Sequence, residues 1–166
     1  MTERQKLLID CDPGHDDAVA ILVGYRHFDL LAVTTVHGNS GLSNTTRNAL
    51  AIMELAGIEG VPVAAGAASP LVGKAPNAAY AHGKSGLDGH DLPTPTLETV
   101  PEHAVDVIIE TARAYQGELV LAVIGPATNI ALALLKEPRL AGWVKEVTVM
   151  GGSAGGGNIT PAAEFN

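Results

Sequence analysis

Cysteine, aromatic residues and positive charge are all scarce in this chain of 166 residues. Its single cysteine, Cys11, excludes a disulfide within the chain and is typical of a reducing compartment. Aromatic residues make up only 4% of the sequence, and 10 Lys and Arg residues stand against 18 Asp and Glu residues. The resulting net charge of −8 argues against non-specific binding to nucleic acid, because such binding needs a basic surface.

Long hydrophobic runs are also missing. No apolar run reaches the roughly 18 to 20 residues that are needed to cross a bilayer. Asp10 and Asp12 interrupt the first apolar stretch, so the amino-terminal residues do not have the pattern of a signal peptide. We therefore expect a cytoplasmic protein that contacts neither a membrane nor nucleic acid.

What is present is the composition of a globular protein, with 46% hydrophobic and 17% charged residues. Short apolar runs alternate along the chain with segments of helical periodicity. The runs that predict strands are 6–11, 30–36, 61–65, 118–124 and 144–150. The segments that predict helices are 16–25, 49–56, 105–112 and 126–134, and a long irregular stretch covers 67–101.

This alternation predicts a single α/β domain over residues 1–166. We expect a doubly wound, mostly parallel sheet with helices on both faces. In such a sheet, ligands bind beyond the carboxyl ends of the strands. That rule selects five places as candidate sites, namely 10–17, 37–39, the residues from 66 onward, 125–129 and 150–166.

The first of these places is strongly acidic. Asp10, Asp12, Asp16 and Asp17 fall within eight residues, where the first strand gives way to the first helix. Two carboxylates about 4 Å apart repel each other by roughly 4 kcal/mol at an effective dielectric of 20. A helix amino terminus offsets only about 1 kcal/mol. A hard divalent cation is the better explanation, because Ca²⁺ and Mg²⁺ prefer carboxylate and carbonyl oxygens.

Two known kinds of cation site were compared with this segment. An EF-hand loop needs Glu at its twelfth position, but Ile21 stands there when the count starts at Asp10, and Val23 when it starts at Asp12. A phosphatase of the haloacid dehalogenase type also places D-x-D after its first strand and uses Mg²⁺. Here the residues that follow are Pro-Gly-His-Asp-Asp, without the usual small hydroxyl residue. The phosphatase stays open as an alternative.

Five segments together resemble the inosine-uridine-preferring nucleoside hydrolases. They are DCDPGHDDA at 10–18, VHGN at 36–39, HGKSGL at 82–87, GPATN at 125–129, and the glycine-rich segment 150–166 that ends in PAAEFN. The resemblance implies a Rossmann-like α/β fold. It also implies an enzyme that hydrolyses the N-glycosidic bond of ribonucleosides to ribose and free base, with Ca²⁺ as its cofactor.

The resemblance divides the chemistry among the acidic residues. Asp12 would be the general base that takes a proton from water, and it would also bind Ca²⁺. Asp17 and the backbone carbonyl of Thr128 would be further calcium ligands, and Asp10 would be a supporting acid near the metal. Asp16 would bind the 2′- and 3′-hydroxyls of ribose.

The resemblance also implies further contacts with the substrate, from Asn39, His82, Met150, Asn158, Glu164 and Asn166. The expected ligand is a small ribonucleoside, and the expected assembly is a homodimer or homotetramer. Members of the family run to about twice this length, so we expect the amino-terminal portion of a nucleoside hydrolase domain. Base preference cannot be read from these residues, and a catalytically inactive fragment is a further alternative.

Overall fold

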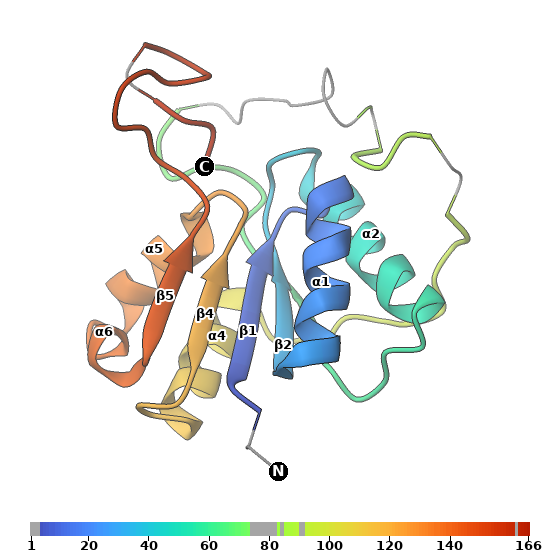
Figure 1. Ribbon diagram of the computed structural model, residues 1–166, viewed down its shortest axis with the longest axis horizontal. Helices are drawn as coiled ribbons and strands as arrows, with labels where there is room; N and C mark the ends of the chain where they lie inside the picture. Colours follow the sequence, from blue (N-terminus) through green and yellow to red (C-terminus); the bar gives the residue numbers. More distant parts are fainter. Residues whose placement is uncertain (1–3, 74–82, 84, 90–91, 162) are drawn as a thin grey trace.

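The computed structural model describes residues 4–73, 83, 85–89, 92–161 and 163–166. At its centre lies a sheet of five strands in the order β3-β2-β1-β4-β5 (Figure 1). The strands are β1 Lys6–Cys11, β2 Asp29–Thr35, β3 Val63–Ala65, β4 Val120–Val123 and β5 Glu146–Val149. All neighbouring pairs run parallel, so the carboxyl ends of the strands lie along one edge of the sheet.

Helices cover both faces of this sheet. They are α1 His15–His27, α2 Leu42–Leu55, α4 Ala104–Ala114, α5 Thr128–Lys136 and the short α6 Leu140–Trp143. The first two pack on one face, and the other three pack on the opposite face (Figure 1). The predicted fold class, a parallel α/β sheet with helices on both faces, is confirmed.

In the central strand β1, three apolar residues follow one another, from Leu7 to Ile9. Leu7 and Ile9 belong to the core beneath α1 and α2, whereas Leu8 belongs to the core beneath α4, α5 and α6. Successive side chains of a strand point to opposite faces, and both faces of β1 are covered. The same alternation turns Asp10 toward the interior, where it is completely buried.

The observed elements differ from the predicted ones mainly at their ends. The first strand has the predicted bounds, and the helix predicted over 126–134 begins at Thr128, two residues later than expected. The helix predicted over 49–56 begins earlier, at Leu42. Its first turns were missed because they bury polar side chains, including Thr45 and Asn48, which give no apolar periodicity. The described residues between β3 and α4 contain neither helix nor strand, as predicted for 67–101.

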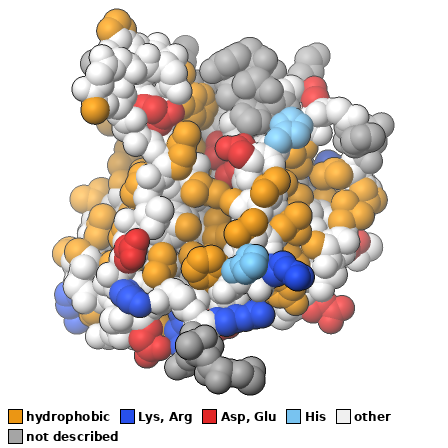
Figure 2. All heavy atoms as spheres, in the orientation of Figure 1, with side chains coloured by type: hydrophobic (Ala, Val, Ile, Leu, Met, Phe, Trp, Pro, Cys, Tyr) orange, Lys and Arg blue, Asp and Glu red, His pale blue; other side chains and the backbone are white. Residues whose placement is uncertain are grey.

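On the face that α1 and α2 cover, no described helix lies over β4 and β5 (Figure 1). Figure 2 shows hydrophobic side chains gathered there, and a groove of about 390 Å³ runs between α1 and these strands. Its lining includes Val23, Val120 and Ala122. Within the described ranges, no helix is long and apolar enough to cross a membrane.

The order of the strands determines where a crevice can form. From β1 the chain passes through α1 to β2 on one side, and from β4 it passes through α5 to β5 on the other side. The segments that follow β1 and β4 therefore diverge above the sheet, which is the arrangement in which parallel α/β proteins bind ligands. The acidic segment 10–17 lies at this point.

Candidate active site

The acidic segment forms the turn between β1 and α1, and it separates its four aspartates. Asp10, Asp12 and Asp17 are buried, whereas Asp16 is exposed on the first turn of α1. Gly14 caps this helix, and its backbone N–H donates to Asp17 Oδ2 at 3.0 Å. The turn thus holds Asp17 inward and leaves the Asp16 carboxylate accessible to solvent.

Asn39, which follows β2, holds Asp12 and Asp17 together. Its backbone N–H donates to Asp12 Oδ2 at 2.6 Å. Its side-chain amide donates to the Asp12 carbonyl at 3.1 Å and to Asp17 Oδ2 at 3.3 Å. One residue of a neighbouring strand end therefore fixes both carboxylates that the sequence predicts as metal ligands.

Two glycines make room for the Asp12 carboxylate. A Cβ atom on Gly38 would lie 1.9 Å from Asp12 Oδ2, and one on Gly125 would lie 2.8 Å from Asp12 Oδ1. Real Cβ atoms do not approach other heavy atoms so closely. The glycines of VHGN and GPATN are therefore explained by the need to bring two backbone segments against one side chain.

Burial and mutual repulsion shift the acidity of this cluster. Burial raises the pKa of Asp12 from 3.8 to about 8, and the negative charge of Asp17 adds to this, against the opposing hydrogen bond from Asn39. Burial also raises the pKa values of Asp17 and Asp10 to about 6. Without a cation, Asp12 thus keeps its proton at neutral pH, and a nearby positive charge would favour its ionised form.

Unsatisfied oxygens test whether a cation fits this cluster. Asp17 Oδ1 and Asp10 Oδ2 are buried and have no hydrogen-bond partner among the described residues. Such atoms are costly in a folded protein unless a donor or a cation completes them. Carboxylate oxygens are the ligands that Ca²⁺ and Mg²⁺ prefer, so the residues present fit a hard divalent cation.

These carboxylates supply only part of a coordination shell. Among the described residues, no group of three or more His, Cys, Asp or Glu is arranged to hold a metal ion. Backbone carbonyls and water would supply the remaining ligands of a cation bound by Asp12 and Asp17. Thr128 lies in the same strand-end region, buried at the start of α5, and its hydroxyl is 3.3 Å from His37 Nε2.

Asp10 precedes the turn and is a residue of strand β1 itself. Its Oδ1 accepts hydrogen bonds from Thr34 Oγ1 at 2.6 Å and from Asn129 Nδ2 at 2.8 Å. Neither Thr34 nor Asn129 was predicted to have a role in the site. Asn129 stands in the motif GPATN. Its hydrogen-bond partners are distant in the sequence, so the motif alone does not reveal them.

Four of the predicted substrate-binding residues form a second cluster in the carboxyl-terminal segment. Asn158 Nδ2 donates to Glu164 Oε1 at 3.1 Å, and the backbone N–H of Asn166 donates to Glu164 Oε2 at 2.9 Å. The side chain of Asn166 donates to the carbonyl of Met150 at 3.1 Å. All four residues lie in the segment that rises above the end of β5 (Figure 1).

The two clusters meet at the end of β4. The Asn166 side chain donates to the carbonyl of Ile124 at 3.0 Å, and the backbone N–H of Ile124 donates to the carbonyl of Asp10 at 2.8 Å. Gly125, the next residue, abuts Asp12. The structure thus brings the acidic turn and the segment 150–166 to the same edge of the sheet. His82 lies outside the described residues.

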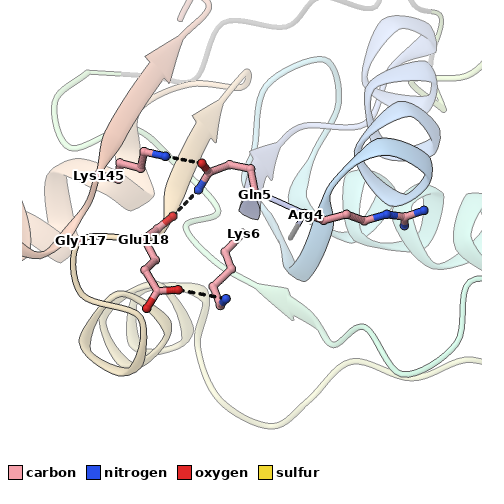
Figure 3. A pocket seen from close by; sticks show the side chains of 6 residues that line it. All are labelled: Arg4, Gln5, Lys6, Gly117, Glu118 and Lys145. Carbon is pink, nitrogen blue, oxygen red and sulfur yellow. Dashed lines mark hydrogen bonds and ion pairs between the residues drawn. The ribbon is translucent and has the colours of Figure 1, made fainter. Parts of the chain in front are cut away.

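A small pocket lies at the opposite edge of the sheet, where the amino ends of the strands meet. It has a volume of about 190 Å³ and is lined by Arg4, Gln5, Lys6, Gly117, Glu118 and Lys145 (Figure 3). Lys6 forms an ion pair with Glu118 at 3.0 Å, Lys145 donates to Gln5, and Gln5 donates to the Glu118 carbonyl. Arg4 points away from the other residues. These contacts join the amino ends of three strands, so the pocket is explained as a structural junction.

Fold and site together define a parallel α/β protein with a buried carboxylate cluster beyond the carboxyl ends of β1 and β4. The sequence model of the inosine-uridine preferring nucleoside hydrolases matches residues 7–166. The chain belongs to this family. Its members are metal-dependent, and the carboxylate oxygens of the acidic turn are the groups of this chain that fit such a metal.

Several curated relatives are similar along nearly the whole chain. The inosine-uridine preferring nucleoside hydrolase of Crithidia fasciculata is 46% identical over 98% of this chain and 53% of its own length. The pyrimidine-specific ribonucleoside hydrolase RihB of Escherichia coli is 42% identical over 99% of this chain and 53% of its own length. The chain therefore spans about half the length of the curated relatives that it matches.

Solved structures agree with these relatives. A plant nucleoside hydrolase, PpNRh1, superposes with a TM-score of 0.92 at 34% identity, over 98% of this chain and 53% of the other. A purine-preferring ribonucleoside hydrolase from Gardnerella vaginalis superposes with a TM-score of 0.90 at 32% identity, over 98% and 54% of the two chains. This chain and these proteins thus share one fold, over about half the length of the solved structures.

Proposed function

We propose that this chain forms the cation-binding and ribose-binding part of an enzyme that hydrolyses ribonucleosides to ribose and free base. The observation that carries the proposal is the Asp12 carboxylate, which is buried between Gly38 and Gly125 and faces the like charge of Asp17. Buried acids with perturbed pKa values are concentrated at catalytic sites, where burial and like charge shift the acidity of the reacting group.

Asp12 is the proposed general base. Hydrolysis of an N-glycosidic bond adds water at the anomeric carbon and releases the base, through a ribosyl cation of the kind that glycosidases form. A base must be ionised to accept a proton, and a bound cation would lower the raised pKa of Asp12 toward the working pH. A calcium ion, when bound, would orient the attacking water and lower its pKa. Asp12 then accepts the proton that this water loses.

The remaining residues divide between the ion and the sugar. Asp17 and the backbone carbonyl of Thr128 are the proposed further ligands of Ca²⁺, with Asp10 as a supporting acid. Asp16 is exposed beside them, so its carboxylate is free to accept hydrogen bonds from the 2′- and 3′-hydroxyls of ribose. The amide and carboxylate groups of Asn158, Glu164 and Asn166, together with Asn39 and Met150, would complete the sugar pocket, and His82 would lie near the base.

The choice of base stays open. The names of the relatives include a pyrimidine-specific and a purine-preferring enzyme, so family membership does not fix this preference. A small ribonucleoside as ligand, a homodimer or homotetramer as assembly and a cytoplasmic location stay predictions. The D-x-D phosphatase is set aside, because the family match covers residues 7–166.

The test is release of free ribose. The purified chain is incubated with inosine and with uridine, in Ca²⁺ and in excess chelator, and ribose is measured as a reducing sugar. A second protein joins residues 1–166 to the carboxyl-terminal half of the Crithidia fasciculata relative. We expect Ca²⁺-dependent release of ribose and base in equal amounts by this joined protein, and lower or no release by the chain alone.

Matched variants decide whether Asp12 carries the reaction. Asp12→Asn should abolish release in both proteins, whereas Asp29→Asn, an exposed change at the opposite edge of the sheet, should leave it unchanged. Failure of the joined protein to release ribose, or undiminished release by Asp12→Asn, would contradict the proposal.

A further inference from the structure

Asn129 links the ends of three strands beneath the acidic turn. Its side chain is completely buried, and its Nδ2 donates to Asp10 Oδ1 at 2.8 Å and to the carbonyl of Thr35 at 3.0 Å. Its Oδ1 accepts from the backbone N–H of Ala67 at 2.9 Å. One amide group thus binds the last residues of β1 and β2 and the residues that follow β3.

The surroundings leave no freedom to this amide. A Cβ atom on Gly66 would lie 2.3 Å from Asn129 Oδ1 and 2.5 Å from its Nδ2, so the backbone beyond β3 is pressed against the amide group. An amide is the side chain that can donate two hydrogen bonds and accept another in this space. A carboxylate would face the Asp10 carboxylate and a carbonyl oxygen, and an alkyl group would remove all three hydrogen bonds.

The hydrogen bonds of Asn129 act on two of the groups that are proposed to bind the cation. Asn129 directly follows Thr128, whose backbone carbonyl belongs to the peptide that joins the two residues. It also holds the side chain of Asp10. Two of the four proposed cation-binding groups are therefore oriented by a single side chain, which is not itself a proposed ligand.

We infer that Asn129 is the positioning residue of the cation site, which acts by holding the Thr128 peptide and the Asp10 carboxylate at the strand ends. The inference rests on the proposed function in that a divalent cation is the ligand. Residues that orient metal ligands typically contribute 10-fold to 100-fold to metal affinity, so loss of this amide should weaken binding by about that factor.

The competing explanation is that Asn129 only stabilises the fold. Thr45 provides the matched control, because it is also completely buried and its hydroxyl donates to the backbone carbonyls of Val36 and Leu42. Thr45→Val removes these two hydrogen bonds, neither of which involves Asp10, Thr128 or the acidic turn. A purely structural role predicts that both substitutions act alike on stability and that neither acts on cation affinity.

The experiment measures Ca²⁺ affinity by calorimetric titration of the 166-residue chain, together with its urea unfolding in chelator. We expect Asn129→Ala to weaken Ca²⁺ binding by about 10-fold or more, and Thr45→Val to stay within about twofold of the natural chain. Gly66→Ala provides a second test, because its Cβ displaces the amide without removing it. Should Asn129→Ala not fold, Gly66→Ala decides, with the same expected direction.

Three results would overturn the inference: Ca²⁺ affinity of both Asn129→Ala and Gly66→Ala equal to that of the natural chain, an equal loss of affinity in Thr45→Val, or no Ca²⁺ binding by the natural chain. Failure of the proposed function looks different. In that case the natural chain binds Ca²⁺ and the Asn129 variant binds it more weakly, yet the joined protein releases no ribose.

Discussion

Replacing Asp12 with Asn should stabilise the cation-free protein at alkaline pH while it abolishes the proposed activity. In the folded protein, burial and the charge of Asp17 hold the pKa of Asp12 at about 8, against an ordinary value of 3.8. An acid whose pKa rises on folding binds more protons in the folded than in the unfolded state over the interval between the two values. The free energy of unfolding therefore falls as the pH rises from about 4 to about 8.

The size of the effect follows from this interval. A rise from 3.8 to about 8 corresponds to about 6 kcal/mol above pH 8, which is the upper limit of what Asp12→Asn can restore. The gain is smaller than this limit, because the amide of Asn is also a buried polar group that needs hydrogen-bond partners. We therefore expect a gain of about 2 kcal/mol at pH 8 and less than about 1 kcal/mol at pH 5. For a chain of this length, each kcal/mol moves the unfolding temperature by about 2–4 °C.

The assay is urea unfolding in chelator at pH 5 and pH 8, with Asp29→Asn as the control for loss of an exposed charge. Added Ca²⁺ should then reverse the order, because only the natural chain gains stability from an ion that binds the folded state. A gain in Asp12→Asn that is equal at both pH values, or a loss at pH 8, would refute the reasoning from burial.

Three further substitutions test separate parts of the structure. Gly38→Ala places a Cβ 1.9 Å from Asp12 Oδ2, so it should lower the free energy of unfolding by about 1–3 kcal/mol and weaken Ca²⁺ binding, measured by urea unfolding and calorimetry. Asp16→Ala should weaken ribonucleoside binding in the joined protein and spare Ca²⁺ affinity, because Asp16 is exposed; the opposite order in calorimetry would reject its assignment to ribose. Leu121→Ala should lower the free energy of unfolding by about 2–5 kcal/mol, because Leu121 is almost completely buried, and a loss below 1 kcal/mol would contradict the core described here.

The sequence predicted the sheet well because parallel strands leave a strong local signal. The run 6–11 has three consecutive apolar residues, Leu7 to Ile9, since both faces of β1 are covered, and its predicted bounds match the structure. The beginning of α2 was missed because Thr45 and Asn48 are buried polar residues, which pattern analysis assigns to a surface or a loop. Their burial is explained by partners that are distant in sequence, such as the carbonyl of Pro13 for Asn48.

The acidic turn could be found from the sequence because four like charges in eight residues are anomalous in any fold. The groups that hold those charges could not be found in this way. Asn39 reaches Asp12 across 27 positions, and Asn129 reaches Asp10 across 119 positions. Nothing local distinguishes these two amides from ordinary turn or helix-start residues, so Asn39 was predicted only through the family resemblance and Asn129 was not predicted.

The strand order also explains why destabilised carboxylates can be kept at this one place. The segments after β1 and β4 diverge, so Asp12 lies where parallel α/β proteins bind ligands, while Gly38 and Gly125 close around it from the ends of β2 and β4. Burial without an opening would give substrate no access to Asp12. An open site without burial would leave the pKa of Asp12 near its ordinary value. The rest of the sheet, with apolar cores on both faces of β1, must then supply the stability that the acidic turn removes. A cation at Asp12 and Asp17 would return part of that stability, which is why binding of Ca²⁺ and resistance to unfolding should rise together in this protein.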